Sequence, residues 1–367
     1  MFQTNKTTRL ALAFFCAALV ALATACSGER SGGSGTTQPA NSTDTVSLKG
    51  SGATFPAPLY AKWLSEYGKV NAKAKIDYQS IGSGGGIQQI TAQLVDFGAS
   101  DSPMSDDDLK KAPAALLHIP TVLGAVVITY NLPEAKQPLR FSPEVIADIF
   151  LGKIKKWDDP KLKADNPGIT LPNTDITVVH RSDGSGTSAV FTDYLSKVNP
   201  EWKEKVGAGK SPNWPVGQGG KGNEGVSGQI KQQPNTIGYV ELAYAVQTGL
   251  PVALIKNKSG NFVEPSLDAV TAAAAESIQT TPEDLRVSIT DAAGAQAYPI
   301  ASYTYLLVYQ DQKDATKGKT LVDFLWWGIH DGEVFAKTLQ YAPLPAEIVK
   351  RAEAKINSIT SGGKTLR

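Results

Sequence analysis

Cysteine is scarce in this sequence of 367 residues, which contains only Cys16 and Cys26. Cys16 lies within an apolar N-terminal stretch. Cleavage of that stretch before Cys26 would leave a single thiol at the first position of the remaining chain, so no disulfide could form within it. The remaining length is sufficient for a sizeable hydrophobic core and predicts two domains.

Neither sign of charge is in excess. The sequence has 36 Lys and Arg residues against 35 Asp and Glu residues, for a formal net charge of +1. Residues 1–25 contain Lys6 and Arg9 and no acid, so removing these two positive charges leaves −1 from Cys26 onward. This balance does not indicate a strongly basic nucleic-acid-binding surface. Recognition of an anion would have to be local.

Residues that carry enzyme chemistry are also few. His118, His180 and His330 are the only histidines, and they lack the spacing of metal ligands. No serine lies in the Gly-x-Ser-x-Gly motif of a nucleophile. Residues 217–222 fit the letters of a dinucleotide-binding motif, but they follow two prolines instead of a clear strand, so we expect a loop. The sequence therefore predicts no enzyme, no cofactor and no metal site.

The N-terminus is typical of a bacterial lipoprotein signal. A basic stretch is followed by apolar residues 10–20 and then by small residues before Cys26. The apolar run is short for a membrane span. We therefore expect a signal peptide at residues 1–25 and lipidation, with palmitate, at Cys26. An ordinary secretory peptide with an incidental cysteine is the alternative. Residues 26–45 are rich in small polar residues and predict a flexible tether.

Three short segments combine small residues with a hydroxyl and lead into a helical stretch. They are residues 51–55, 82–86 and 183–188. The start of a helix exposes unpaired backbone N–H groups and the positive end of the helix dipole, and glycine lets a bound group approach that backbone closely. One such turn is a common loop, but three in one chain favour a socket for an anion.

Strand and helix patterns alternate along the chain, which predicts an α/β architecture. Strands are expected at residues 46–48, 76–78, 97–100, 122–130, 176–180 and 301–309. Helices are expected at residues 56–70, 87–95, 142–151, 187–198, 321–327, 334–339 and 346–356, with a capping box at Ser105 and Asp108. Ligands of open α/β sheets bind at the carboxyl ends of strands, where the three turns and Asp101 would converge.

Two charged residues at the third turn suit an oxyanion. Arg181 offers a fixed fork of donors that matches the oxygens of a tetrahedral anion. Asp183, two residues further on, can hold that guanidinium in place. A surface loop beside a routine ion pair is the alternative that the same residues allow.

Together, seven segments resemble the phosphate-binding lipoprotein of bacterial ABC phosphate importers. They are residues 52–63, 81–86, 95–101, 150–159, 181–188, 219–225 and 237–241. The resemblance implies a two-lobed periplasmic binding protein of the type II kind, in which strands near residues 123–130 and 302–309 cross between the lobes and a ligand cleft lies between them. Residues 46–124 and 302–367 would form lobe 1, and residues 125–301 would form lobe 2.

The resemblance also implies the contacts with phosphate. These are Thr54, Phe55, Ser83, Asp101, Arg181, Ser185, Gly186 and Thr187, with Asp183 as the ion-pair partner of the arginine. Backbone N–H groups, hydroxyls and the guanidinium would donate to the anion, whereas Asp101 would accept the proton that hydrogen phosphate still carries. Sulfate has no proton at neutral pH and would meet Asp101 as a like charge.

The family's partners follow from the same resemblance. It implies an extracytoplasmic protein, anchored by lipid to the cell membrane, that hands inorganic phosphate to the permease and ATPase of an ABC importer. Three alternatives stay open. A binding protein for sulfate or molybdate is disfavoured by Asp101, and a secreted phosphatase or phosphotransferase is disfavoured by the lack of a nucleophile with a base or metal ligands. An adhesive surface lipoprotein would leave the donor-rich turns without a purpose.

Overall fold

The computed structural model describes residues 45–367; the expected signal peptide, Cys26 and nearly all of the tether lie outside the described residues. The strands are β1 Val46–Gly52, β2 Ala74–Ser80, β3 Phe97–Ser100, β4 Leu116–Asn131, β5 Arg140–Phe141, β6 Thr177–Arg181, β7 Gln218–Gly220, β8 Thr236–Glu241, β9 Leu254–Lys256, β10 Phe262–Val263, β11 Ala301–Tyr309, β12 Thr360–Ser361 and β13 Lys364–Thr365. The α-helices are α1 Ala57–Val70, α2 Ser83–Thr91, α3 Asp106–Lys111, α4 Pro143–Phe150, α5 Pro160–Asp165, α6 Gly186–Val198, α7 Pro200–Lys205, α8 Gly222–Gln232, α9 Leu242–Thr248, α10 Leu267–Ser277, α11 Ala315–Ile329 and α12 Ala346–Asn357, and the 3-10 helices are η1 Asp331–Phe335 and η2 Lys337–Leu339.

One eight-stranded sheet has the strand order β2-β1-β3-β11-β4-β8-β6-β7. Strands β2, β1 and β3 are parallel to one another, as are β8, β6 and β7, whereas β11 and β4 run antiparallel to their neighbours. The long strand β4 joins the two groups, because residues 116–125 pair with β11 and residues 126–131 pair with β8. We call the part from β2 to β11 the first half-sheet and the part from β8 to β7 the second half-sheet. The expected α/β architecture is confirmed.

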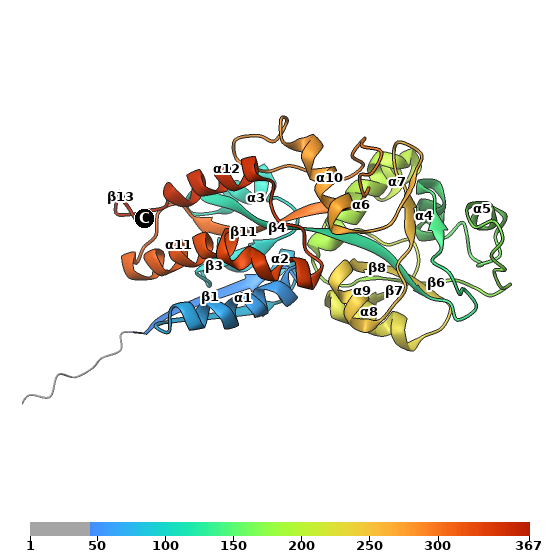
Figure 1. The fold of residues 1–367 in the computed structure, drawn as a ribbon, viewed down its shortest axis with the longest axis horizontal. Helices are drawn as coiled ribbons and strands as arrows, with labels where there is room; N and C mark the ends of the chain where they lie inside the picture. The colour runs from blue at the N-terminus through green and yellow to red at the C-terminus, as the bar shows by residue number, and fades with distance from the viewer. Residues whose placement is uncertain (1–44) are drawn as a thin grey trace, which may run out of the picture. The chain divides into compact units, whose positions relative to one another are not determined.

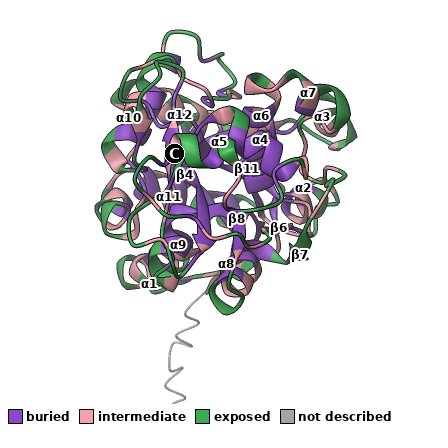
Figure 2. Ribbon diagram, turned by 90° about the vertical axis from the view of Figure 1, so that its right-hand side faces the viewer, coloured by how far each residue is buried: buried purple, intermediate pink, exposed green. Residues whose placement is uncertain are grey.

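Helices flank both half-sheets (Figure 1). Helices α1, α2 and α11 pack on the first half-sheet, and α6, α8 and α9 pack on β8 or on the adjoining strand β4. Strand β11 is buried along its whole length, and β4 is buried over residues 118–130. Figure 2 shows the same contrast, with buried strands inside and helices that expose their outer faces. Burial on both faces explains why these two strands are continuous apolar runs in the sequence.

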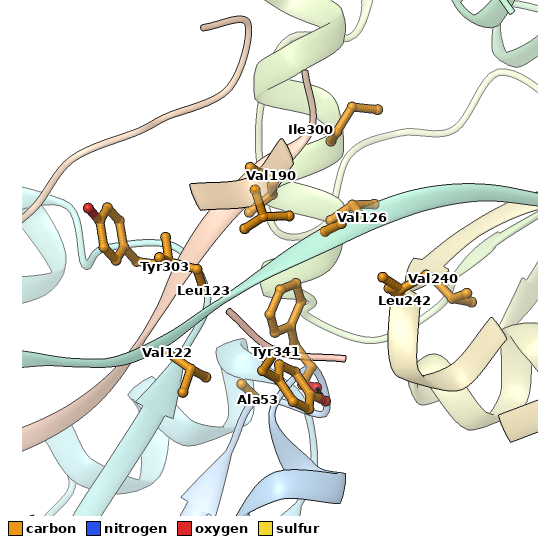
Figure 3. Close-up of a cluster of buried hydrophobic side chains, with 14 of the residues drawn as sticks. Ala53, Val122, Leu123, Val126, Val190, Val240, Leu242, Ile300, Tyr303 and Tyr341 are labelled. Atoms are coloured by element: carbon orange, nitrogen blue, oxygen red, sulfur yellow. Dashed lines mark hydrogen bonds between the residues drawn. The ribbon is translucent and has the colours of Figure 1, made fainter. Parts of the chain in front are cut away.

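The point at which β4 changes partner is packed with apolar side chains. Leu123 and Val126 lie on either side of this point, and both are fully buried. Figure 3 shows that they are surrounded by side chains from later segments, including Val240, Ile300 and Tyr341, which are also buried. Each such side chain contributes roughly 1.5–3 kcal/mol when fully buried. This core fixes the strand that carries the chain from one half-sheet to the other.

Most of the expected elements are confirmed, but β4 and α11 each begin six residues earlier than expected, and α2 begins at Ser83 and not at residue 87. The glycines that suggest a turn are part of the helix. Gly86 packs directly on β1, where an added Cβ would lie 2.6 Å from the Cα of Gly52. Only glycine permits this close approach. The shift places Ser83 in the first helical turn, where its backbone N–H has no acceptor within the helix.

Two other expectations are wrong. Residues 217–222 are not a loop, because Gln218–Gly220 form β7 beside β6 and α8 begins at Gly222. A strand of three residues is too short to show an alternating pattern. Residues 334–339 form parts of η1 and η2 and not an α-helix. In this segment the carbonyl of Gly332 accepts a hydrogen bond from the Trp63 indole at 2.8 Å, which favours a short 3-10 turn packed on α1.

Candidate anion-binding site

Four of the predicted site residues lie at the carboxyl ends of strands from both half-sheets. Thr54 and Phe55 follow β1, Asp101 directly follows β3, and Arg181 is the last residue of β6. All four are at most 3% exposed. The topology therefore brings these four residues to the edge of the sheet at which ligands of open α/β sheets bind.

The start of α6 brings the other predicted residues into the same cluster. Gly186 is the first residue of α6, and a Cβ added to it would collide with the Ser83 Oγ and with an Asp101 carboxylate oxygen. The backbone N–H of Gly84 donates to the carbonyl of Gly184 at 2.7 Å, which joins the second and third turns. The structure thus brings all eight predicted contact residues together, and glycine at 186 is required by the close approach.

Four helix starts contribute to this cluster. They belong to α1, α2, α6 and α8. Ser185 is the N-cap of α6, where its Oγ accepts the N–H of Ser188 at 3.0 Å and keeps its own proton to donate. Thr187 is the second residue of that helix and is fully buried. Unpaired N–H groups and helix dipoles at these starts favour a bound anion.

The Arg181 guanidinium is held in place by Asp183. Its Nε donates to Asp183 Oδ1 at 2.8 Å and its Nη2 donates to Asp183 Oδ2 at 2.5 Å, while Nη1 donates to the Thr187 Oγ1 at 3.3 Å. Partial burial opposes ionisation of Asp183, but its bonds to Arg181 and its attraction to that charge hold its pKa below the usual range. Each terminal guanidinium nitrogen keeps one further N–H that these bonds do not use. These two N–H groups can donate to two oxygens of one anion.

Asp101 is the acceptor of the cluster. Thr304 Oγ1 donates to Asp101 Oδ1 at 2.9 Å, and Ser83 Oγ donates to Asp101 Oδ2 at 3.3 Å. Burial raises the pKa of Asp101 to about 7, against the hydrogen bond from Thr304 and the charge of Arg181, which lower it. The carboxyl can therefore accept or donate a proton near neutral pH.

Sequence reasoning missed three residues of the cluster. The amide of Asn223 on α8 lies between the hydroxyls of Thr54 and Thr187, and the Tyr244 hydroxyl donates to the Thr54 carbonyl at 2.6 Å. Thr304, which bonds to Asp101, is the third. For Asn223 the signal is present in the sequence, because glycines precede it at a helix start in the same way as in the other three turns.

Residues 45–367 do not have the features of a metal site or of a membrane span. No three His, Cys, Asp or Glu side chains there are grouped so that they could hold a metal ion. His180, on β6, stacks on Trp214 with a distance of 4.9 Å between ring centroids. None of the helices in this range has the length and apolar character needed to cross a membrane.

The fold and site identify the class of protein. The family model described as "PBP superfamily domain" matches residues 37–326. A high-affinity periplasmic phosphate-binding protein, solved with phosphate bound, has a TM-score of 0.67 at 22% identity, over 84% of this chain and 93% of that one. The phosphate-binding protein from Stenotrophomonas maltophilia has a TM-score of 0.66 at 20% identity, with the same two coverages of 84% and 93%. The chain therefore has the fold of the PBP superfamily.

Curated relatives define the family. The phosphate-binding protein PstS of Pasteurella multocida is 47% identical over 327 residues, which are 88% of this chain and 94% of the relative. The corresponding protein of Methanocaldococcus jannaschii is 41% identical, over 89% of this chain and 90% of the relative. This chain belongs to the PstS family of phosphate-binding proteins, which confirms the resemblance inferred from its sequence.

Proposed function

We propose that this protein captures inorganic phosphate outside the cytoplasm and delivers it to the permease and ATPase of an ABC importer. The observation that carries the proposal is one buried cluster in which the Arg181 fork, hydroxyls and helix starts lie beside the acceptor Asp101. A phosphate removed from water needs several donors for its oxygens, and hydrogen phosphate needs one acceptor for its own proton. The names of the PstS relatives support the same ligand.

Each residue has a defined part in this proposal. Backbone N–H groups of Thr54, Phe55, Ser83 and Gly186 donate to the anion, as do the hydroxyls of Thr54, Ser185 and Thr187. The Ser83 hydroxyl donates as well, once it turns its single proton from Asp101 to the ligand. Arg181 donates from its free N–H pair, and Asp183 orients it. Asp101 accepts the ligand's proton. Binding needs no covalent step, so we propose a transport protein that works without catalysis, cofactor or metal.

Calorimetric titration at neutral pH tests the proposal. Phosphate is expected to release or absorb heat with one ligand bound per chain, and sulfate is expected to bind far more weakly than phosphate. Binding of sulfate but not phosphate would indicate a protein for another oxyanion. Hydrolysis of a phosphate ester by the purified protein would indicate an enzyme, and the absence of heat with both anions would contradict an anion-binding function.

We also propose that the protein has two lobes, residues 46–124 with 302–367 and residues 125–301. In support, β4 changes its partner between Ala125 and Val126, and the chain returns to the first half-sheet at Ala301, where β11 begins. Contacts such as the hydrogen bond from Gly84 to Gly184 join the two proposed lobes around the site. Such contacts can form only when the lobes are closed.

Phosphate is therefore expected to make the protein more compact. Closure by hinge bending reduces the radius of gyration, which small-angle scattering measures with and without saturating phosphate. The Arg181→Ala variant is the control, at a phosphate concentration that just saturates the unsubstituted protein, because its weaker binding should leave it largely unliganded. An unchanged radius for the unsubstituted protein at saturation would mean that the site does not close by a lobe movement.

A lipid anchor at Cys26 is the proposed means of retention at the membrane. The expected result is that the full chain, expressed in a bacterium, partitions with membranes, whereas the Cys26→Ala variant does not. The Cys16→Ala variant is the matched control and should behave like the unsubstituted protein, because that residue is removed with the signal peptide. One acyl chain binds a membrane only weakly, so firm retention indicates more than one. Unsubstituted mature protein in the soluble fraction alone would contradict the anchor.

A further inference from the structure

Asn223 joins two of the proposed phosphate-binding hydroxyls. It is the second residue of α8, and its side chain is fully buried. Its Nδ2 donates to the Thr54 Oγ1 at 2.7 Å and to the Thr187 Oγ1 at 3.2 Å. One amide group therefore uses both of its protons on hydroxyls that come from the starts of two different helices.

The orientation of this amide is fixed by its other end. Asn223 Oδ1 accepts the backbone N–H of Glu241 at 3.0 Å. A backbone N–H can only donate, so the amide oxygen must face Glu241 and the NH₂ group must face the two hydroxyls. A rotation of the amide by half a turn would place donor against donor and leave both hydroxyls without these bonds.

The two hydroxyl oxygens are left with no free lone pair. Each oxygen accepts a second hydrogen bond besides the one from the Asn223 amide. Thr54 Oγ1 accepts one from the backbone N–H of Asn223 at 3.3 Å. Thr187 Oγ1 accepts one from Arg181 Nη1 at 3.3 Å. A hydroxyl has two lone pairs and one proton. Each can therefore act further only as a donor, and within residues 45–367 neither donates to a protein acceptor.

We propose that Asn223 is a positioning residue of the anion site, because its amide obliges the Thr54 and Thr187 hydroxyls to donate their protons to the bound anion. The inference deepens the proposed function and rests on it. Hydroxyls that are already turned toward the ligand need no reorientation when it binds, and this preorganisation favours binding.

Asn223→Asp replaces the donating NH₂ group with an accepting oxygen, in a side chain of the same shape. A carboxylate accepts protons and cannot supply them, so both hydroxyls would turn toward residue 223 and away from the ligand. The new negative charge would also repel phosphate, which has to be separated from the effect on the hydroxyls. The Gln232→Glu variant places the same charge on the exposed last residue of α8, away from the two hydroxyls, and serves as the charge control.

A double-mutant cycle separates the two effects. Phosphate affinity is measured by calorimetry for Thr54→Val and for Thr187→Val, each in the unsubstituted, Asn223→Asp and Asn223→Ala backgrounds. In the unsubstituted background each valine is expected to weaken binding about 10- to 100-fold, the value of a hydrogen bond to a charged group. In the Asn223→Asp background the same valine is expected to weaken binding by no more than about twofold, the scatter of independent sites.

Each outcome of this cycle either supports or overturns the positioning role of Asn223. If Asn223→Asp does not fold, the Asn223→Ala background is used, in which the valine substitutions are expected to cost less than in the unsubstituted protein. Equal costs in every background would overturn the inference, since Asn223 would then not orient the hydroxyls. If the unsubstituted protein does not bind phosphate at all, the proposed function fails and not this step alone.

Discussion

Phosphate binding by the Arg181→Ala variant is expected to be weaker by about 1.5–3.5 orders of magnitude, which corresponds to roughly 2–5 kcal/mol. Arg181 is 3% exposed, and its guanidinium carries the positive charge of the cluster. Its removal takes away the free pair of N–H donors and leaves the Asp183 carboxylate without the partner that keeps its pKa low. Calorimetry at neutral pH measures the loss.

Two further variants show which property of the arginine matters. Arg181→Lys keeps the charge but not the planar fork that Asp183 and an anion can share, so most of the loss is expected to remain. Arg351→Ala removes an arginine that donates to the Thr281 carbonyl on another part of the molecule, and should leave phosphate affinity unchanged. If Arg181→Ala binds phosphate as tightly as the unsubstituted protein, Arg181 is not part of the site.

The parts of the site that the sequence predicts are those with local signals. A glycine and a hydroxyl at the start of a helix can be recognised within a few residues, and this holds for Ser83, Ser185 and Thr187. Asp101 and Arg181 stand directly at strand ends, where the topology of an α/β sheet places a ligand. The apolar runs of β4 and β11 reveal strands that are buried on both faces.

The parts that the sequence does not predict depend on contacts between distant segments. Thr304 lies in an expected strand, but nothing local shows that its hydroxyl reaches Asp101, which precedes it by 203 positions. Asn223 is missed for a different reason. Strand β7 has three residues and pairs only with β6, so its sequence shows no strand pattern and the helix start after it passes for a loop. Tertiary pairing, and not local propensity, determines both positions.

Asp101 is expected to decide between phosphate and sulfate. Thr304 donates to Oδ1 of this carboxylate, so Oδ2 is the oxygen that lies nearest to Ser83 and to the start of α6. In Asp101→Asn the amide oxygen can keep the bond from Thr304, and the NH₂ group then takes the place of Oδ2 and can donate to an anion. Asp101→Asn should keep substantial phosphate binding, and its sulfate binding should be measurably tighter than that of the unsubstituted protein.

Asp101→Ala removes the acceptor at this position, whereas Asp101→Asn keeps an amide oxygen there. The proton of hydrogen phosphate would lose its acceptor, at a cost of about 1–3 kcal/mol, so this variant should bind phosphate more weakly than Asp101→Asn does. Phosphate and sulfate are titrated separately by calorimetry at neutral pH. If Asp101→Asn excludes sulfate as strictly as the unsubstituted protein, the discrimination lies elsewhere and this account of the site is wrong.

The pH dependence of sulfate binding provides the strongest test of this account, because burial raises the pKa of Asp101 to about 7. The ionised carboxylate repels sulfate, whereas the protonated carboxyl can donate to it in the same way as the asparagine amide. With a pKa of about 7, about one-tenth of the carboxyls are protonated at pH 8 and about nine-tenths at pH 6. Sulfate affinity of the unsubstituted protein should therefore rise about ninefold as the pH falls from 8 to 6. The Asp101→Asn variant has no proton to gain there, so its sulfate affinity should stay constant over this range, and a parallel rise in both proteins would assign the proton to another group.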